Sequence, residues 1–68
     1  MKECWFCVGY KIDSGSKTEL WDMFVAAPTA SMAKKMATEE VKKYHPKAKV
    51  TIEYAKTMTE DEMYNMVN

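Results

Sequence analysis

The sequence predicts a single α+β domain spanning residues 1–68, in which a three-stranded antiparallel sheet carries one long helix on one face. Two alternating apolar segments joined by a turn-rich stretch predict a hairpin, a segment with helical spacing follows, and a third alternating segment comes after it. The expected order is ββαβ(α), with a short C-terminal helix last. Because a helix linking the second and third strands makes a crossover, we expect the first strand to be central, in the order 2-1-3.

The hairpin is predicted from alternation and turn chemistry. Residues 3–12 read as a strand whose even positions are all apolar or aromatic. Asp13-Ser14-Gly15-Ser16 is a turn cluster with a glycine that can take positive φ, and residues 17–27 form the second strand.

The pairing of these strands follows from the charge at Asp22. If Ile12 pairs with Lys17, Asp22 stays in water, Trp21 faces the core, and Trp5 lies opposite Phe24 on the other face. A slip by one residue would exchange the faces and bury the Asp22 carboxylate, which costs several kcal/mol. We therefore predict the pairing of Ile12 with Lys17.

The helix is bounded by two prolines. Pro28 ends the second strand, Thr29 or Ser31 can cap the helix, and His45-Pro46 stops it near Tyr44. Its apolar stripe comprises Met32, Ala33, Met36, Ala37, Val41 and Tyr44.

The last two elements follow from a further alternation and a capping box. Residues 47–55 read as a strand that points Val50, Ile52 and Tyr54 inward. Residues 59–62 form a capping box that opens a short helix from Glu60 to about Val67. That helix carries the apolar Met63, Tyr64, Met66 and Val67.

Composition excludes several classes of protein. The formal net charge is zero, with ten lysines and no arginine. This argues against a dedicated duplex-binding protein and makes self-association a fair expectation. The longest apolar run, residues 23–28, is far too short to span a membrane, and we find no signal-peptide pattern. We expect a cytoplasmic protein without membrane contact.

No motif indicates an enzyme, a metal or a cofactor. Cys4 and Cys7 form a C-x-x-C, but within a strand this spacing sends the two side chains to opposite faces, so we expect Cys4 in the core and Cys7 at the surface. His45 has no partner at a recognisable spacing, and Gly9 and Gly15 do not make a phosphate loop. We therefore predict no catalytic residue.

One apolar patch is predicted on the sheet face away from the long helix, formed by Trp5, Cys7, Leu20 and Phe24. Three interpretations stay open. The C-terminal helix covers the patch with Met63, Met66 and Val67; or a second copy does, in a homodimer; or another macromolecule docks there with Trp5 as anchor. Single-stranded RNA ranks lower, because the neighbouring residues include acids.

A lysine cluster supports an alternative partner. The stretch from residue 34 to residue 49 holds an excess of positive charge that could track a phosphate backbone. The candidate nucleic-acid contacts are Lys34, Lys35, Lys42, Lys43, Lys47 and Lys49.

The ββαβ order, the short length and the lack of catalytic residues resemble those of many small phage- or mobile-element-encoded proteins, including inhibitors that occupy a host protein's surface. The resemblance is architectural and implies no specific site. The sequence therefore predicts a non-enzymatic protein-interaction module that acts by surface occlusion or assembly, with another protein or itself as partner. The alternative is a nucleic-acid-binding domain that uses the lysine-rich helix face.

Overall fold

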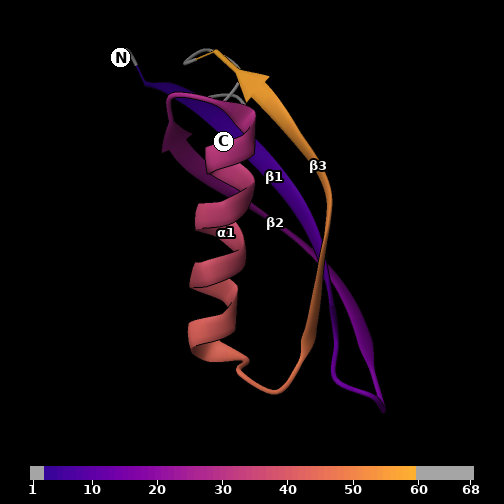
Figure 1. Ribbon diagram of the computed structural model, residues 1–68. Coiled ribbons are helices and arrows are strands. Elements are labelled where there is room, and N and C mark those ends of the chain that lie inside the picture. The colour runs from indigo at the N-terminus through magenta and orange to yellow at the C-terminus, as the bar shows by residue number, and fades with distance from the viewer. Residues whose placement is uncertain (1–2, 60–68) are drawn as a thin grey trace.

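The computed structural model describes residues 3–59 and has the predicted α+β architecture (Figure 1). Its elements are β1 (Cys4–Asp13), β2 (Thr18–Ala27), α1 (Ala30–Tyr44) and β3 (Lys49–Met58). The strands form one antiparallel sheet in the order β2-β1-β3, which confirms the predicted strand order. The predicted short helix at 60–67 lies outside the described residues.

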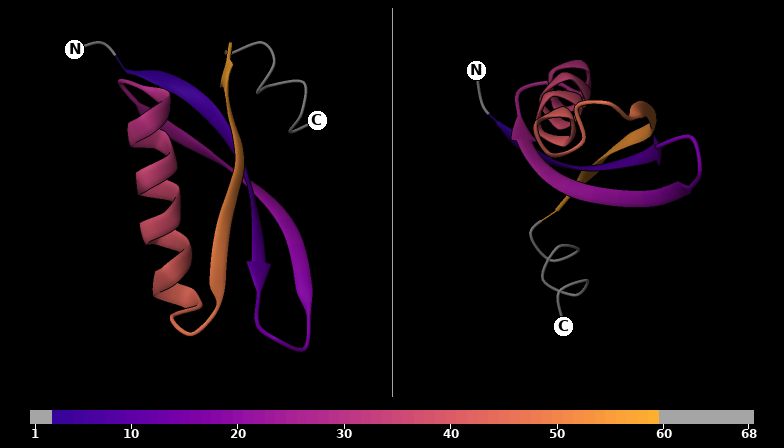
Figure 2. Two further views of the ribbon diagram at one scale, coloured as in Figure 1. Left: turned by 45° about the vertical axis from the view of Figure 1, so that its right-hand side comes forward. Right: turned by 90° about the horizontal axis from the view of Figure 1, so that it is seen from below.

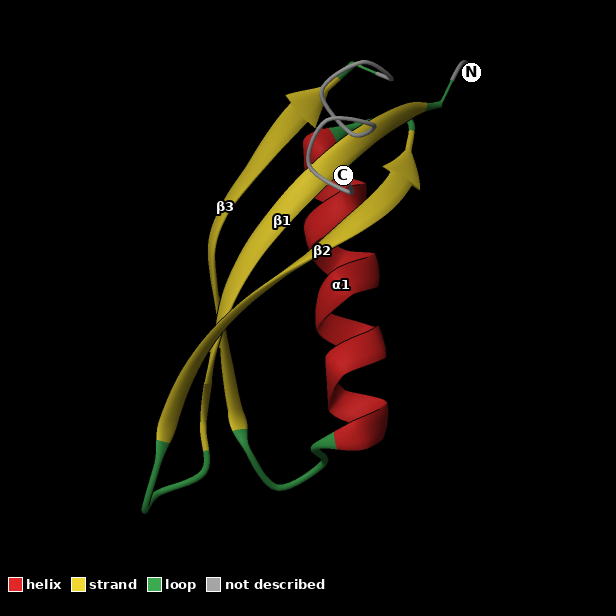
Figure 3. Cartoon of the chain, turned by 180° about the vertical axis from the view of Figure 1, so that it is seen from behind, coloured by secondary structure: helices red, strands yellow, loops and turns green. Residues whose placement is uncertain are grey.

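The described chain has two layers, the sheet and α1. Figure 2 shows α1 lying along one face of the sheet, and Figure 3 shows the other face from behind. We call the face away from α1 the outer face. The core lies between the layers, where the alanines of α1 let the helix approach the strands closely. Its buried members are Phe6, Val8, Tyr10, Ile12, Val25, Ala27, Ala33, Ala37 and Val41.

Helix α1 is held at both ends as the sequence suggested. Thr29 is the N-cap, and its hydroxyl accepts a hydrogen bond from the Met32 N–H at 3.2 Å. At the other end the His45 N–H donates to the Val41 carbonyl at 2.9 Å. Lys42 and Lys43 lie in the last turn, where positive charge suits the helix dipole.

The hairpin register differs from the predicted one. Ile12 lies opposite Glu19, not opposite Lys17. The turn is the reason. The Asp13 carboxylate accepts a hydrogen bond from the Gly15 N–H at 2.9 Å, and Gly15 has φ 91°, a conformation that favours glycine. The Ser14 N–H donates to the Lys17 carbonyl at 3.0 Å, so only the residues between them remain in the turn.

The change in register leaves the faces of the hairpin as predicted but changes the neighbours. Since the shift is from Lys17 to Glu19, an even number of residues, Asp22 still projects from the outer face and Trp21 from the α1 side. The predicted pairing of Trp5 with Phe24 is wrong. Trp5 lies opposite Ala26, and Phe24 lies opposite Cys7.

Strand β3 contains a bulge that the alternation did not predict. Gly9 pairs with Tyr54, but the next residue, Tyr10, pairs with Ile52, so Glu53 is extra. Up to Ile52 the inward positions are those predicted. Beyond Glu53 the alternation is inverted. The prediction that Tyr54 points inward is therefore wrong, because its side chain lies on the outer face.

Candidate functional site

Among residues 3–59, strands β2 and β3 form the two free edges of the sheet, and these edges differ in how well they are protected. Strand β3 has the bulge at Glu53 and exposed lysines at positions 49 and 56. Bulges, lysines and prolines are the usual devices that prevent an edge strand from pairing with another chain. Strand β2 has no bulge, lysine or proline over the ten residues from Thr18 to Ala27, and its charged side chains are the two acids Glu19 and Asp22. We call this less protected side of the sheet the β2 edge.

Large apolar side chains accompany the β2 edge on both faces. Leu20 is 75% exposed and Phe24 37%, and both project from the outer face. Trp21 is 54% exposed and projects from the α1 side, opposite the buried Tyr10. The edge thus offers backbone hydrogen-bonding groups between two apolar surfaces.

On the α1 side, a groove runs between β2 and the helix. One hollow of about 350 Å³ has Trp21, Met23 and Tyr44 among its lining residues. A second hollow begins beside it, with Met23, Phe24 and Met36 among its lining residues. Since both hollows have Met23 and Glu40 in their linings, they lie next to each other along β2, and we call the two together the β2 groove. The lining is mainly apolar.

Two ion pairs hold charges at the rim of this groove. The Trp21 indole N–H donates to a Glu19 carboxylate oxygen at 2.7 Å, and the Lys17 ammonium lies 2.9 Å from the other oxygen. The hydrogen bonds from Lys17 and from Trp21 hold the pKa of Glu19 below its ordinary value. Glu40 pairs with Lys43 at 3.4 Å.

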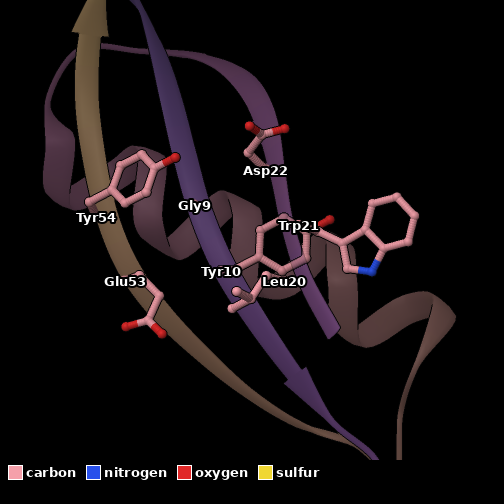
Figure 4. A pocket seen from close by; sticks show the side chains of 7 residues that line it. All are labelled: Gly9, Tyr10, Leu20, Trp21, Asp22, Glu53 and Tyr54. Atoms are coloured by element: carbon pink, nitrogen blue, oxygen red, sulfur yellow. The ribbon is translucent and has the colours of Figure 1, made fainter. Parts of the chain in front are cut away.

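The outer face has a separate hollow around Gly9 (Figure 4). Its volume is about 440 Å³, and Leu20, Asp22, Glu53 and Tyr54 contribute to its lining. The Tyr54 ring lies against Gly9 so closely that a methyl group at that position would collide with ring carbons Cε2 and Cζ. The glycine therefore makes room for the cross-strand tyrosine that the bulge places on this face.

The cysteines occupy the reverse of their expected positions. Cys7 is buried, only 6% exposed, and Cys4 is exposed. Cys7 lies opposite Phe24 on one neighbouring strand and close to Tyr54 on the other. Burial, and next the charge of Asp22, raise the pKa of the Cys7 thiol. The charge that Cys7 carries once it ionises to the thiolate is in turn the main reason that the pKa of Tyr54 is raised. Both groups are held neutral, which suits neither a nucleophile nor a base at neutral pH.

The predicted apolar patch is divided in the structure. Trp5 and Phe24 line the same hollow, but Asp22 lies between Phe24 and Leu20 along β2, and Cys7 is covered. The predicted contacts at positions 63 and 66 lie outside the described residues. Trp21 was not among the predicted contacts, because its place on the α1 side suggested burial. Its position on an edge strand was the signal that it could remain exposed.

The predicted lysines do not line the β2 groove. All six are exposed, four of them on α1, one in the loop before β3 and one at the first residue of β3: Lys34, Lys35, Lys42, Lys43, Lys47 and Lys49. Lys43 is partly neutralised by Glu40. The lysine surface and the apolar groove are therefore different parts of the molecule.

Within residues 3–59, no group of three or more His, Cys, Asp or Glu side chains could hold a metal ion. In that same range, α1 is too short and too polar to cross a membrane. No protein-family model, curated protein or solved structure matches this chain.

Proposed function

We propose that this chain is a non-enzymatic protein-interaction module that binds an extended polypeptide segment at the β2 edge. The observation that carries the proposal is the difference between the two free edges. Strand β3 has a bulge and lysines, whereas β2 is regular and carries the exposed Leu20, Trp21 and Phe24. Addition of a strand to an open sheet edge is a recurring mode of peptide recognition.

Backbone groups and side chains of the β2 edge have different roles in such a complex. Backbone hydrogen bonds along β2 supply affinity without sequence preference, and the side-chain surfaces on the two faces supply specificity. Trp21 is the expected anchor, since large aromatic residues dominate binding energy at interfaces. Its hydrogen bond to Glu19 fixes the indole before a partner arrives, which reduces the entropy lost on binding.

Site-specific photo-crosslinking tests this proposal directly. A photoreactive amino acid replaces Leu20 on β2 in one variant and Thr51 on β3 in another, and both are expressed in the native host. The two positions are matched, because both lie opposite Lys11 in the same row across the sheet. We expect the Leu20 variant to form an adduct of one discrete mass and the Thr51 variant to form none.

Mass spectrometry of the adduct identifies the crosslinked partner, which is either another protein or a second copy of this chain. Adducts at both positions in equal yield, or at neither, would refute binding at the β2 edge.

The exposed lysines of α1 support the alternative function, nucleic-acid binding. Lys34, Lys35 and Lys42 make no ion pair with a described residue, so they could contact phosphates. Retention of an oligonucleotide at about 0.15 M salt that is lost in a Lys35→Glu, Lys42→Glu double variant would favour this function over protein binding.

A further inference from the structure

We propose that the segment bound at the β2 edge is β2 of a second copy of this chain, paired antiparallel about a two-fold axis at Met23. This inference rests on the proposed function and names its partner. It would form a continuous six-stranded sheet from the two three-stranded sheets, with both helices on the same side. It follows from three features: the backbone groups left free on β2, the side chains that each pairing would juxtapose, and the charge near the start of α1.

The free backbone groups belong to the even-numbered residues of β2. The Ser14 N–H donates to the Lys17 carbonyl, so these two residues form a hydrogen-bonded pair. Hydrogen-bonded and non-hydrogen-bonded pairs alternate along an antiparallel ladder. In the observed register, Val8 and Met23 are therefore also a hydrogen-bonded pair. The N–H and C=O groups of Asp22 and Phe24 consequently point away from β1, towards the free edge.

Two-fold pairing of β2 with itself allows few registers. Opposed residues in an antiparallel pair project from the same face, so the axis must pass through a residue and not between two. Near the middle of β2, the candidates are Asp22, Met23 and Phe24. An axis at Asp22 sets two carboxylates directly opposite each other, which is destabilising. An axis at Phe24 sets Leu20 opposite Pro28 of the partner subunit, which has no N–H to donate.

The axis at Met23 separates the two carboxylates and places the partner's Pro28 opposite Thr18, the first residue of β2, where the missing N–H affects only the end of the ladder. Asp22 then lies opposite Phe24 of the partner subunit, and Leu20 opposite the partner's Ala26. On the α1 side, Trp21 lies opposite the partner's Val25. No charged residue of β2 lies directly opposite a like charge, since the two Asp22 residues are diagonal neighbours, and both apolar surfaces of the edge are continued by the partner.

The ends of this pairing are complementary in charge. Glu19 would lie opposite the partner's Ala27, close to the start of the partner's helix. The first turn of α1 contains no acidic residue. A carboxylate brought there from the second copy would interact favourably with the positive end of the helix dipole. The protected β3 edges would then bound the sheet, so a closed dimer is expected and not a fibre.

Solution mass is the first test. We expect sedimentation analysis to give twice the monomer mass of 7.9 kDa at concentrations of tens of micromolar. Asp22→Pro should give a folded monomer, because the Asp22 N–H points to the free edge, so that proline at this position removes no hydrogen bond within the chain. Thr57→Pro is the matched control at the β3 edge: Thr57 pairs with Phe6, whose backbone groups face β2, so its N–H also points outward. This variant should remain dimeric.

Cysteine substitution tests the register, in a Cys4→Ser background that removes the exposed native thiol. Met23→Cys, Asp22→Cys and Phe24→Cys each place a cysteine opposite its own copy in only one of the three registers. Opposed Cα atoms lie about 4.5–5.5 Å apart in an antiparallel pair, within the range of a disulfide. Under oxidation with diamide, we expect covalent dimers from Met23→Cys at least tenfold faster than from the other two.

The outcomes separate this inference from the proposed function. Fastest crosslinking by Asp22→Cys or Phe24→Cys would overturn the Met23 axis. A monomeric wild-type chain would overturn the second copy as the partner. If that monomer still crosslinks from Leu20 to a different polypeptide, binding at the β2 edge stands. If it crosslinks to nothing, both proposals fall.

Discussion

Substitution of Gly9 by alanine should destabilise the protein, but should stabilise it once the Tyr54 ring is absent. The bulge at Glu53 places that ring against Gly9, where an added methyl group would collide with it. Gly9 does not have a positive φ, so its backbone conformation accepts alanine without strain. In a strand, replacement of glycine by alanine is otherwise worth about 0.5–1 kcal/mol, because the unfolded chain loses entropy.

The expected magnitude follows from the exposure of Tyr54. Its side chain is 47% exposed, so about half of its surface is covered. For a tyrosine this is roughly 100 Å², which at about 25 cal/mol per Å² contributes at most ~2.5 kcal/mol. If displacement from Gly9 removes about half of that, Gly9→Ala lowers the free energy of unfolding by about 0.5 kcal/mol net. In a Tyr54→Ala background, Gly9→Ala should raise the free energy of unfolding by about 0.5–1 kcal/mol.

A double-mutant cycle by urea denaturation measures this coupling, which should be about 1–1.5 kcal/mol. Tyr54→Phe is the control, because it keeps the ring and should keep the coupling. If Tyr54 instead pointed under α1, as simple alternation predicts, Tyr54→Ala would cost about 3–5 kcal/mol as a core truncation and would show no coupling to Gly9. That result would refute the bulge.

Three further predictions concern the core and the titratable groups. Iodoacetamide should label Cys4 but not Cys7 in the folded protein, and equal labelling would contradict the burial of Cys7. The free energy of unfolding should fall as the pH rises above 9. The reason is that the raised pKa of Cys7 keeps its thiol neutral in the folded state at a pH where the thiol of the unfolded chain already ionises. Phe6→Ala should cost about 3–5 kcal/mol by urea denaturation, and Phe6→Leu clearly less. Acid titration of Glu19 should change the fluorescence of Trp21 with a midpoint below pH 4.5, because protonation of the carboxylate weakens its hydrogen bond to the indole. The stability that this bond provides should be lost as the pH falls through the lowered pKa of Glu19. A Glu19→Gln variant should show no such transition.

The sequence was sufficient for the elements and their order, because these depend on local signals. Alternation, the Thr29 cap and the prolines that flank the helix each act within a few residues. The sheet face from which each hairpin residue projects was also predictable, since the free-energy cost of burying the Asp22 carboxylate outweighs every other difference between the two possible arrangements. Register was less accessible, because it depends on how the turn closes. Asp13 and Gly15 close it more tightly than the composition of the turn suggested.

The candidate site was the least predictable part, because it depends on what neighbouring strands leave uncovered. The bulge at Glu53 inverts the second half of β3, and the one sequence signal for it was Gly9, a glycine inside an otherwise apolar strand. Trp21 has the correct parity for burial but remains half exposed, since it lies on an edge strand beside the helix. Such exposure depends on the width of the sheet, which no local pattern specifies.

Amide hydrogen exchange along β2 measures most directly whether the β2 edge binds a strand. In a concentrated sample, the outward amides of Asp22 and Phe24 should exchange slowly, and dilution should speed their exchange together with dissociation of the dimer. The outward amide of Thr57 on β3 should exchange fast at every concentration. Fast exchange at Asp22 and Phe24 in a sample that sedimentation shows to be dimeric would contradict pairing at this edge.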